Sequence, residues 1–451
     1  MSHWYHQIGL PTPSGSLQED IDADVCIVGG GLTGLWTAYY LARADPSLRI
    51  VVLEAEFVGF GASGRNGGWL SAELAGSRSN YAAGHGGVEG ANRLARELSA
   101  SVDEVIAMCG EEGIDADIVK GGVVFAATSA AQLARMEDEL AAHAQNPDSS
   151  VRRLDAAEVQ ARVQVVGARG GTFDPQCARV QPAKLVQGLA SVVRNLGVSI
   201  YEQSRVVSLR AGSASTGEGS VRAPIVLRCL EGYTSSIPGE RRTWLPMNSA
   251  MIATQPLGAS VWEEIGWQGR ELLGDFSNAY FYAQRTADDR IAIGGRGIPY
   301  RFGSRTDVDG QTQEWTIQSL RAVLHRTFPA VSSAEIEHAW CGVLAVPRDW
   351  CASVSLDRAT GLGWAGGYVG SGLTATNLAG RTLRDLVIGH DTDLTSLPWT
   401  NRKVKRWEPE PLRWLGVRGM YGLYREADRR EAAGLNAPSR LARFADAISG
   451  R

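Results

Sequence analysis

The clearest pattern of apolar and polar positions lies near the start of the chain, at residues 24–54. Residues 25–28, VCIV, form a short apolar run that ends in glycines, residues 32–43 show apolar positions at helical spacing, and residues 50–53, IVVL, form a second apolar run. Short apolar runs bounded by turn residues predict buried strands, and a period near 3.6 predicts a helix. The pattern therefore predicts a strand, a glycine-rich turn, a helix and a second strand.

The turn between the first strand and the helix has the spacing Gly29-x-Gly31-x-x-Gly34. One glycine permits the tight turn, one lets the backbone approach a pyrophosphate, and one lets the helix pack closely on the strand. The free N–H groups and the dipole at the helix N-terminus favour a bound phosphate. Glu54 ends the second strand, where a carboxylate accepts hydrogen bonds from ribose hydroxyls. Strands, helix and acidic residue together predict a dinucleotide site.

A second glycine-rich segment, GFGASGRNGG at residues 59–68, follows closely. It holds five glycines and no large aliphatic side chain. Small residues let the backbone approach phosphate oxygens, and successive backbone N–H groups attract negative charge. A glycine-rich run this soon after Glu54 favours FAD over NAD as the dinucleotide.

Three other segments have readable patterns. Residues 129–146 show the apolar spacing of an amphipathic helix behind a serine cap, and residues 211–221, AGSASTGEGSV, predict a flexible loop. Residues 400–451 mix cations with aromatic side chains, and acidic residues interrupt the basic stripe. We expect a helical tail packed on the body with a solvated arginine face, and binding of a membrane surface is the alternative.

Composition excludes several classes of protein. The 451 residues are 44% hydrophobic and 21% charged with a net charge of −4, which is ordinary for a globular protein and predicts no nucleic-acid partner. No apolar run approaches the length of a membrane span, and the first residues lack the pattern of a signal peptide, so we expect a cytoplasmic location. Six scattered cysteines without a C-x-x-C pair predict neither a metal site nor a disulfide framework.

The order of these motifs resembles a known family. VCIVGGGLTG, then Glu54, then GFGASGRNGG resemble the D-amino-acid-oxidase-like superfamily of FAD-dependent oxidoreductases, and especially its gamma-glutamylputrescine-oxidase-like branch. Four later segments resemble that superfamily in order: residues 179–209, 248–257, 280–300 and 364–381. The resemblance implies an α/β fold in which a Rossmann-type FAD-binding lobe is interwoven with an antiparallel-sheet substrate lobe.

The resemblance also implies the division of the chain. Residues 24–80, 150–235 and 341–395 would form the FAD-binding lobe, residues 115–150 and 240–340 the substrate lobe, and residues 400–451 the helical tail.

The same resemblance implies the residues that hold FAD. The first glycine motif and Glu54 would hold the nucleotide, and residues within 59–68 would border the phosphates, the ribityl chain and the flavin. Val206 would contact the adenine end through its backbone, and the glycines before the last helix would place its N-terminus at the pyrimidine end. The implied FAD-binding residues are Gly29, Gly31, Gly34, Glu54, Ala62, Ser63, Arg65, Asn66, Gly67, Val206, Gly370, Gly372 and Leu373.

One segment departs from the family pattern. Residues 224–236, PIVLRCLEGYTSS, carry Arg228, Cys229 and Glu231 where family members usually have small residues. The departure puts the local backbone contact to the nucleotide in question.

Candidate pocket residues lie on the segments that resemble the substrate wall or the flavin edge. Aromatic faces attract cations and enclose amines, and the planar fork of an arginine pairs with a carboxylate. Ordinary core packing, or a structural salt bridge for the arginine, is the alternative for each. No catalytic base is predicted, because the histidines are dispersed and flavin chemistry needs none. The candidates are Trp69, Tyr280, Tyr282, Arg296, Tyr300 and Trp340.

Two features of relatives bear on the flavin. Some tether it through a cysteine near the position of Cys341, so Cys341 is a candidate for covalent attachment, although non-covalent FAD is the main expectation. Some hold a lysine over the flavin for the reaction with oxygen, whereas this chain has no lysine between Lys184 and Lys403.

The resemblance implies an FAD-dependent amine oxidoreductase. Its substrate would be a primary or secondary amine, either a polyamine derivative or an N-substituted amino acid, oxidised to an imine that water hydrolyses. O2 would be the acceptor and H2O2 the product, with a dehydrogenase as the open alternative. Two other classes stay open: a flavin-binding sensor without catalysis, and a monooxygenase that uses NAD(P)H.

Overall fold

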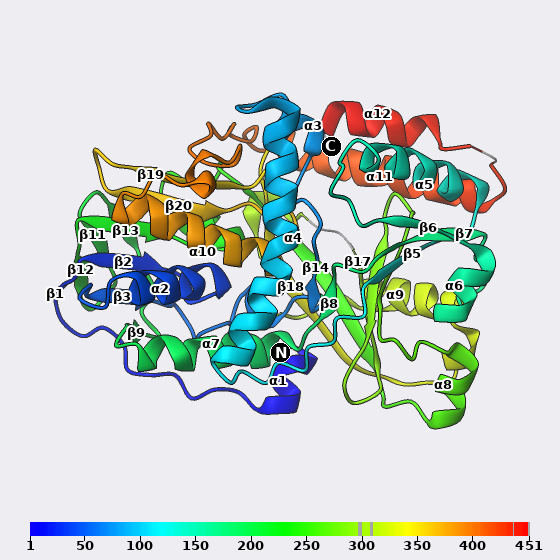
Figure 1. Cartoon of the computed structure of the whole chain (residues 1–451), viewed down its shortest axis with the longest axis horizontal. Coiled ribbons are helices and arrows are strands. Elements are labelled where there is room, and N and C mark those ends of the chain that lie inside the picture. The colour runs from blue at the N-terminus through cyan, green and yellow to red at the C-terminus, as the bar shows by residue number, and fades with distance from the viewer. Residues whose placement is uncertain (296–299, 307–309, 436, 450–451) are drawn as a thin grey trace.

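The computed structural model describes residues 1–295, 300–306, 310–435 and 437–449. Figure 1 shows two large sheets side by side, each with its own helices, and a helical hairpin at the C-terminal end of the chain beside the second sheet. The chain passes repeatedly between the two halves, as the α/β fold predicted from the sequence requires.

The first half is built on a six-stranded sheet. Its strand order is β19-β20-β13-β2-β3-β9, and all neighbouring pairs are parallel except β19 with β20. The strands are β2 (Val25–Val28), β3 (Ile50–Leu53), β9 (Ser199–Tyr201), β13 (Ile225–Arg228), β19 (Ser353–Asp357) and β20 (Leu362–Gly366).

Both faces of this sheet are covered, which explains the unbroken apolar runs in the sequence. Val25 and Ile27 of β2 belong to one core cluster, whereas Cys26 and Val28 belong to another, because side chains alternate along a strand. The first cluster packs under α2 (Leu32–Ala44), α4 (Gly87–Glu111), α7 (Pro182–Asn195) and α10 (Gly372–Ile388). The second packs against a four-stranded sheet of β1 (Ile21–Asp22), β10 (Ser208–Arg210), β11 (Ser213–Ser215) and β12 (Ser220–Arg222).

The second half is built on an eight-stranded mixed sheet of order β18-β14-β17-β16-β15-β5-β7-β6. Every neighbouring pair is antiparallel except β15 with β5. The strands are β5 (Val123–Ala127), β6 (Arg152–Asp155), β7 (Gly170–Asp174), β14 (Leu245–Thr254), β15 (Leu272–Asp275), β16 (Phe281–Arg285), β17 (Ile291–Gly295) and β18 (Ile336–Val346). The helices of this half are α5 (Ala130–His143), α6 (Ala156–Arg162), α8 (Ala259–Ile265) and α9 (Glu314–Thr327).

Two boundaries differ from the sequence-based division of the chain. Residues 152–174, assigned to the FAD-binding lobe, contain β6, α6 and β7, and both strands belong to the second sheet, because β7 pairs with β5 and with β6. Residues 341–346 were also assigned to the FAD-binding lobe. They belong to β18, which begins at Ile336 and pairs with β14 in the second sheet along its length. Short strands carry no mark of their partner in the sequence, so their sheet follows only from pairing.

The remaining elements flank the two halves. They are α1 (His3–Ile8), β4 (Trp69–Leu70), α3 (Arg78–Ala82), β8 (Ala178–Arg179), α11 (Leu412–Ala432) and α12 (Arg440–Ser449), of which β4 and β8 pair with each other. Helices α11 and α12 pack together through Tyr424, Ala427, Ala442 and Ala445. Within the described ranges, no helix is long and apolar enough to cross a membrane.

Candidate functional site

A cavity of about 1240 Å³ is lined by residues of both halves. Tyr282 and Phe125 reach it from the second sheet, and Leu32 and Thr33 from the start of α2. Fifteen residues proposed from the sequence line this cavity: Gly29, Gly31, Glu54, Ala62, Ser63, Arg65, Asn66, Gly67, Trp69, Val206, Tyr280, Tyr282, Gly370, Gly372 and Leu373. The tertiary structure therefore brings the separate glycine motifs and the first aromatic candidates into one space.

The first glycine motif forms one end of the cavity. Gly29 has a φ of +114°, which favours glycine, and a Cβ on Gly34 would overlap the carbonyl oxygen of Gly29. Gly34 thus lets α2 pack closely on the strand instead of lining the cavity. The N-cap residue of α2, Gly31, has no side chain to cap the helix, and the Leu32 N–H donates to Ser63 Oγ of the 59–68 segment at 2.8 Å. The N-terminus of α2 thus faces the cavity with its first N–H group occupied.

Glu54 completes this end. Its carboxylate accepts hydrogen bonds from the N–H groups of Gly30, at 2.8 Å, and Glu56, at 3.0 Å, which hold it at the carboxyl edge of the sheet. Burial raises the pKa of the Glu54 carboxyl. A bound ribose would offer hydroxyl donors to this desolvated acceptor, as the motif predicts.

The 59–68 loop is held from behind by the N-terminal helix, which the sequence analysis missed. Ser2 Oγ donates to the Gly64 carbonyl at 2.7 Å, and Trp4 Nε1 donates to the Asn66 carbonyl at 2.8 Å. Trp340 Nε1 donates to the carbonyl of Arg65 at 2.9 Å. A tryptophan in a short helix gives no sequence signal for such a contact, because its acceptor is a backbone carbonyl some sixty residues away.

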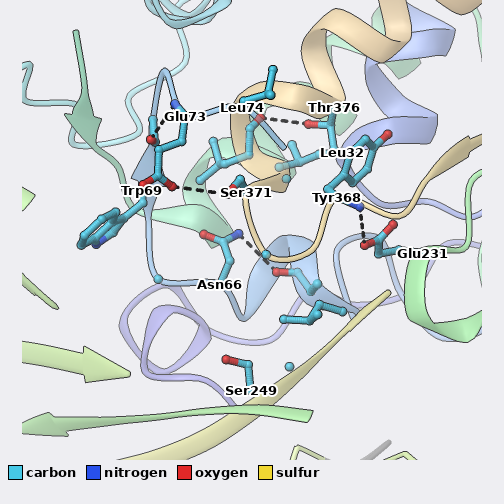
Figure 2. A pocket seen from close by; sticks show the side chains of 18 of the residues that line it. Leu32, Asn66, Trp69, Glu73, Leu74, Glu231, Ser249, Tyr368, Ser371 and Thr376 are labelled. Carbon is cyan, nitrogen blue, oxygen red and sulfur yellow. Dashed lines mark hydrogen bonds between the residues drawn. The ribbon is translucent and has the colours of Figure 1, made fainter. Parts of the chain in front are cut away.

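The departure from the family pattern has a structural role. Glu231 accepts hydrogen bonds from the N–H groups of Ala345 at 3.0 Å and Gly367 at 2.8 Å. It also accepts one from the Tyr368 N–H at 3.3 Å, which Figure 2 shows. Burial raises the pKa of this carboxyl to about 7, although the three N–H donors oppose the shift. Glu231 therefore ties β13 to β18 and to the loop that precedes α10.

Arg228, the other charged residue of that departure, is also accommodated. Its guanidinium pairs with Glu240 at 2.6 Å and lies 5.3 Å from the ring centroid of Trp244. It is absent from the cavity lining, whereas Cys229 and Glu231 belong to it.

The N-terminus of α10 forms the middle of the cavity wall. Ser371 is its N-cap residue and, within the described chain, no side chain caps that terminus. Figure 2 shows Ser371 directed toward Glu73, to which its hydroxyl donates at 3.5 Å. The Glu73 side chain is exposed to the same space, and desolvation by the surrounding protein raises the pKa of its carboxyl. A helix terminus that stabilises negative charge and a cavity-facing carboxylate thus lie beside each other.

Aromatic rings form the next part of the wall. The Trp69 ring lies 5.9 Å from Phe125 and 6.1 Å from Tyr282, both in edge contact. The hydroxyl groups of Tyr282 and Ser249 lie 2.9 Å apart. This arrangement encloses an apolar or cationic group and leaves one hydroxyl pair to orient it.

Carboxyl groups with raised pKa values lie farther along the lining. Burial, reinforced by the charge of Glu73, raises the pKa of Glu139 to about 7. Burial raises the pKa of Asp275 to about 6, opposed by hydrogen bonds from Ser277 and Phe281. The sequence analysis did not single out these carboxylates, since they come from separate elements.

Three proposed residues lie elsewhere, which corrects their assignment to the pocket or the flavin. Tyr300 donates to Glu410 and packs with Trp407, Trp340 packs against Trp4 and Met251, and Cys341 lies in the core of the second half. None of the three is among the cavity-lining residues of the described chain. The part of β18 that lines the cavity is Gly342 to Leu344, and a match to the strand could not decide at which residue the lining starts. Arg296 lies outside the described residues.

The residues present fit FAD. The lining of this one cavity includes the α2 terminus, Glu54, the 59–68 loop and the α10 terminus. Two helix N-termini in this lining suit a pyrophosphate at one place and an electron-rich ring at the other. Described residues contain no cluster of His, Cys, Asp and Glu suited to a metal ion.

The sequence is similar to known flavoenzymes. The profile of the FAD dependent oxidoreductase family matches residues 24–386. Gamma-glutamylputrescine oxidoreductase of Escherichia coli K12 is 29% identical over 387 residues, covering 84% of this chain and 86% of that protein. Glycine oxidase of Geobacillus kaustophilus is 22% identical over 84% of this chain and 96% of its own length.

Solved structures show the same fold. Glycine oxidase of Geobacillus kaustophilus matches with a TM-score of 0.69 at 19% identity, over 85% of this chain and all of its own. Iminodiacetate oxidase of Chelativorans sp. BNC1 matches with a TM-score of 0.67 at 18% identity, over 83% of this chain and 99% of its own. These findings confirm the α/β fold and the FAD cofactor predicted from the sequence.

Proposed function

Because the chain belongs to the family of FAD dependent oxidoreductases and acts on C–N bonds, we propose that it oxidises a primary or secondary amine held against its aromatic wall. The observation that carries the proposal is the continuity of one cavity, which joins the FAD cradle to Trp69, Tyr282 and Glu73. The similarity to gamma-glutamylputrescine oxidoreductase, at 29% identity, supports the proposal that the amine has a polyamine-like chain.

Bound FAD supplies the two-electron acceptor for the C–H bond next to nitrogen. The chain's own residues bind, orient and desolvate. Glu54 and the α2 terminus would hold the nucleotide, the hydrogen-bonded 59–68 loop would border the ring, and the α10 terminus would favour negative charge on it.

The aromatic wall and Glu73 position the amine. Trp69 and Tyr282 exclude water and attract a cation through their faces, and the Tyr282–Ser249 hydroxyl pair orients a polar group. The Glu73 carboxylate favours an ammonium and, with its raised pKa, accepts the proton that the amine must lose before oxidation.

The net reaction balances without any further co-reactant than water and an electron acceptor. The amine loses two electrons and two protons to become an imine, and water adds across the C=N bond to give a carbonyl compound and a free amine. O2 takes up the two electrons and two protons as H2O2 if the enzyme is an oxidase.

An amine panel mixed anaerobically with the holoenzyme tests the proposal. We expect one class of amine to bleach the visible flavin band, and Trp69→Ala to slow bleaching at least tenfold, while Trp315→Phe, a change at an exposed tryptophan of α9, leaves it unchanged. Peroxide formation after admitting O2 separates oxidase from dehydrogenase. A flavin that no amine bleaches would favour the non-catalytic sensor instead.

A further inference from the structure

The C-terminal hairpin, α11 and α12, lies outside the segment that matches the family profile, which ends at residue 386. Figure 1 shows the two helices beside α5, over the end of the second sheet. The tail therefore lies outside the part of the chain that the family profile describes, beside the second half where that half contributes to the cavity.

Asp428 of α11 holds a cavity-lining loop. Its Oδ1 accepts from the Asn278 N–H at 2.9 Å and from Asn278 Nδ2 at 2.8 Å, and its Oδ2 accepts from the Ala279 N–H at 2.9 Å. Residues 276–280 have no regular strand or helix, so this carboxylate supplies bonds that a sheet partner would otherwise make. Asn278 and Tyr280 of the same loop line the cavity.

Glu431, one turn later, makes a second tie. Its carboxylate forms a bidentate pair with Arg135 of α5, at 3.0 and 2.7 Å, and is 4% exposed. Arg135 Nε donates to the Phe276 carbonyl at 2.5 Å, and Glu431 Oε1 accepts from the Ser439 N–H at 2.8 Å. One buried carboxylate thus joins α5, the 276–280 loop and the start of α12.

Helix α12 reaches the cavity directly. Asp446 belongs to the lining, and Tyr424 of α11 donates to its Oδ1 at 2.6 Å. The hairpin therefore both positions lining residues and contributes one.

We propose that the C-terminal hairpin is the outer wall of the substrate cavity and selects amines by the length and polarity of the part remote from the reacting C–N bond, with Asp428 as a positioning residue. This inference rests on the proposed amine oxidation. Asn278, Tyr280 and Asp446 give this part of the lining a polar character, so the selected amine has a polar far end. A short amine that ends at the Trp69 wall does not reach the hairpin.

The test compares Asp428→Asn with Glu426→Gln in the holoenzyme. Both exchange a carboxylate for an amide on α11, but Glu426 pairs only with the exposed Arg429 and Arg430 in the described structure. We expect Asp428→Asn to raise KM about tenfold for a long diamine, the effect of one lost charge-assisted hydrogen bond, while kcat for the shortest accepted amine stays unchanged. Glu426→Gln leaves both values as in the wild type. An equal change in KM for long and short amines would overturn the selection.

Hydrogen exchange supplies a readout that needs no substrate. In Asp428→Asn the amides of Asn278 and Ala279 exchange faster, with the flavin spectrum unaltered, whereas Glu426→Gln leaves their exchange unchanged. Unchanged exchange in Asp428→Asn overturns the positioning role. If no amine bleaches the wild-type flavin, the proposed function fails, and the exchange result alone then decides whether the hairpin holds the loop.

A milder variant guards against misfolding. Asn278→Ala removes the carboxamide, with its Nδ2 bond to Asp428 and its side-chain bond to Glu431, and keeps both backbone bonds to Asp428, so it should fold even if Asp428→Asn does not. It is expected to shift KM for the long diamine in the same direction by a smaller factor, and a KM identical to that of the wild type would contradict the inference.

Discussion

The two ends of the cavity are built by different means. At the flavin end, backbone N–H groups, helix termini and glycines from short sequence motifs form the surface. At the outer end, side chains of α5, the 276–280 loop and the C-terminal hairpin meet through Arg135, Asp428 and Glu431. Recognition of a constant cofactor can rest on backbone geometry, whereas recognition of a variable substrate rests on side chains that tertiary packing brings together.

The largest expected effect comes from Gly34→Ala at the flavin end. The new methyl group would overlap the Gly29 carbonyl, a backbone group that cannot swing away, and the Ile27 side chain lies 3.2 Å from the same position. We expect a loss of about 3 kcal/mol in the free energy of unfolding, the upper end of overpacking costs, and a rise of about a hundredfold in the Kd for FAD. Urea titration and flavin release during filtration measure these changes, and retention of stoichiometric FAD would contradict the close-packing role.

A smaller effect is expected for Glu231→Gln, which alters the loop before α10. The carboxamide NH2 cannot accept the Gly367 N–H, so one buried donor loses its partner. We expect this unpaired donor to lower the free energy of unfolding by about 2 kcal/mol and to raise the Kd for FAD about thirtyfold. A Kd equal to that of the wild type would show that the loop does not depend on Glu231.

The pH dependence of stability gives Glu231 a second test. Its pKa rises from 4.5 to about 7 in the folded protein, so folding takes up a proton between these values. The stabilising contribution is fully present below about pH 4.5 and is lost as the pH rises through about 7. We expect Tm to fall more between pH 5.5 and 7.5 in the wild type than in Glu231→Gln, and parallel curves would refute this.

Trp4→Phe tests the support behind the 59–68 loop. Phenylalanine keeps an aromatic ring but removes the Nε1 donor to the Asn66 carbonyl. We expect the free energy of unfolding to fall by about 1 kcal/mol, the net value of one neutral hydrogen bond. The Kd for FAD should rise about fivefold. Trp315→Phe on α9 is the matched control, and equal effects of the two variants would argue against a role in the cofactor loop.

The smallest effect is expected in the C-terminal hairpin, for Gly416→Ala in α11. A Cβ on Gly416 in α11 meets nothing within 4 Å, in contrast to Gly34. Alanine should stabilise the helix by about 0.5 to 1 kcal/mol through its higher helix propensity, and FAD binding should not change. A thermal melt that shows destabilisation would mean that α11 is covered by another surface.

The sequence predicted local motifs better than strand partners or side-chain directions. Gly29, Gly31 and Glu54 lie together because one strand–turn–helix–strand unit contains them, so spacing alone was sufficient. Trp340 and Cys341 lie in apolar clusters on the two faces of β18, and the part of β18 that lines the cavity starts one residue later, at Gly342; a match to the strand does not tell where along it the cavity starts. Residues 152–174 were assigned to the wrong sheet for a related reason, since a short strand joins whichever edge its neighbour offers.

By itself, the sequence determined the strand–turn–helix–strand unit and its glycine turn, since glycine spacing, apolar runs and an acidic strand end specify backbone geometry over short stretches. The resemblance of its ordered motifs then carried the family and the C–N chemistry. Only the tertiary structure decided that Ser2 and Trp4 hold the 59–68 loop and that Glu231 holds the loop before α10. It also decided that Asp428 and Glu431 join the C-terminal hairpin to the cavity wall. Each of these contacts links positions far apart in the chain through a single polar side chain, and such a contact leaves no periodic pattern in the sequence.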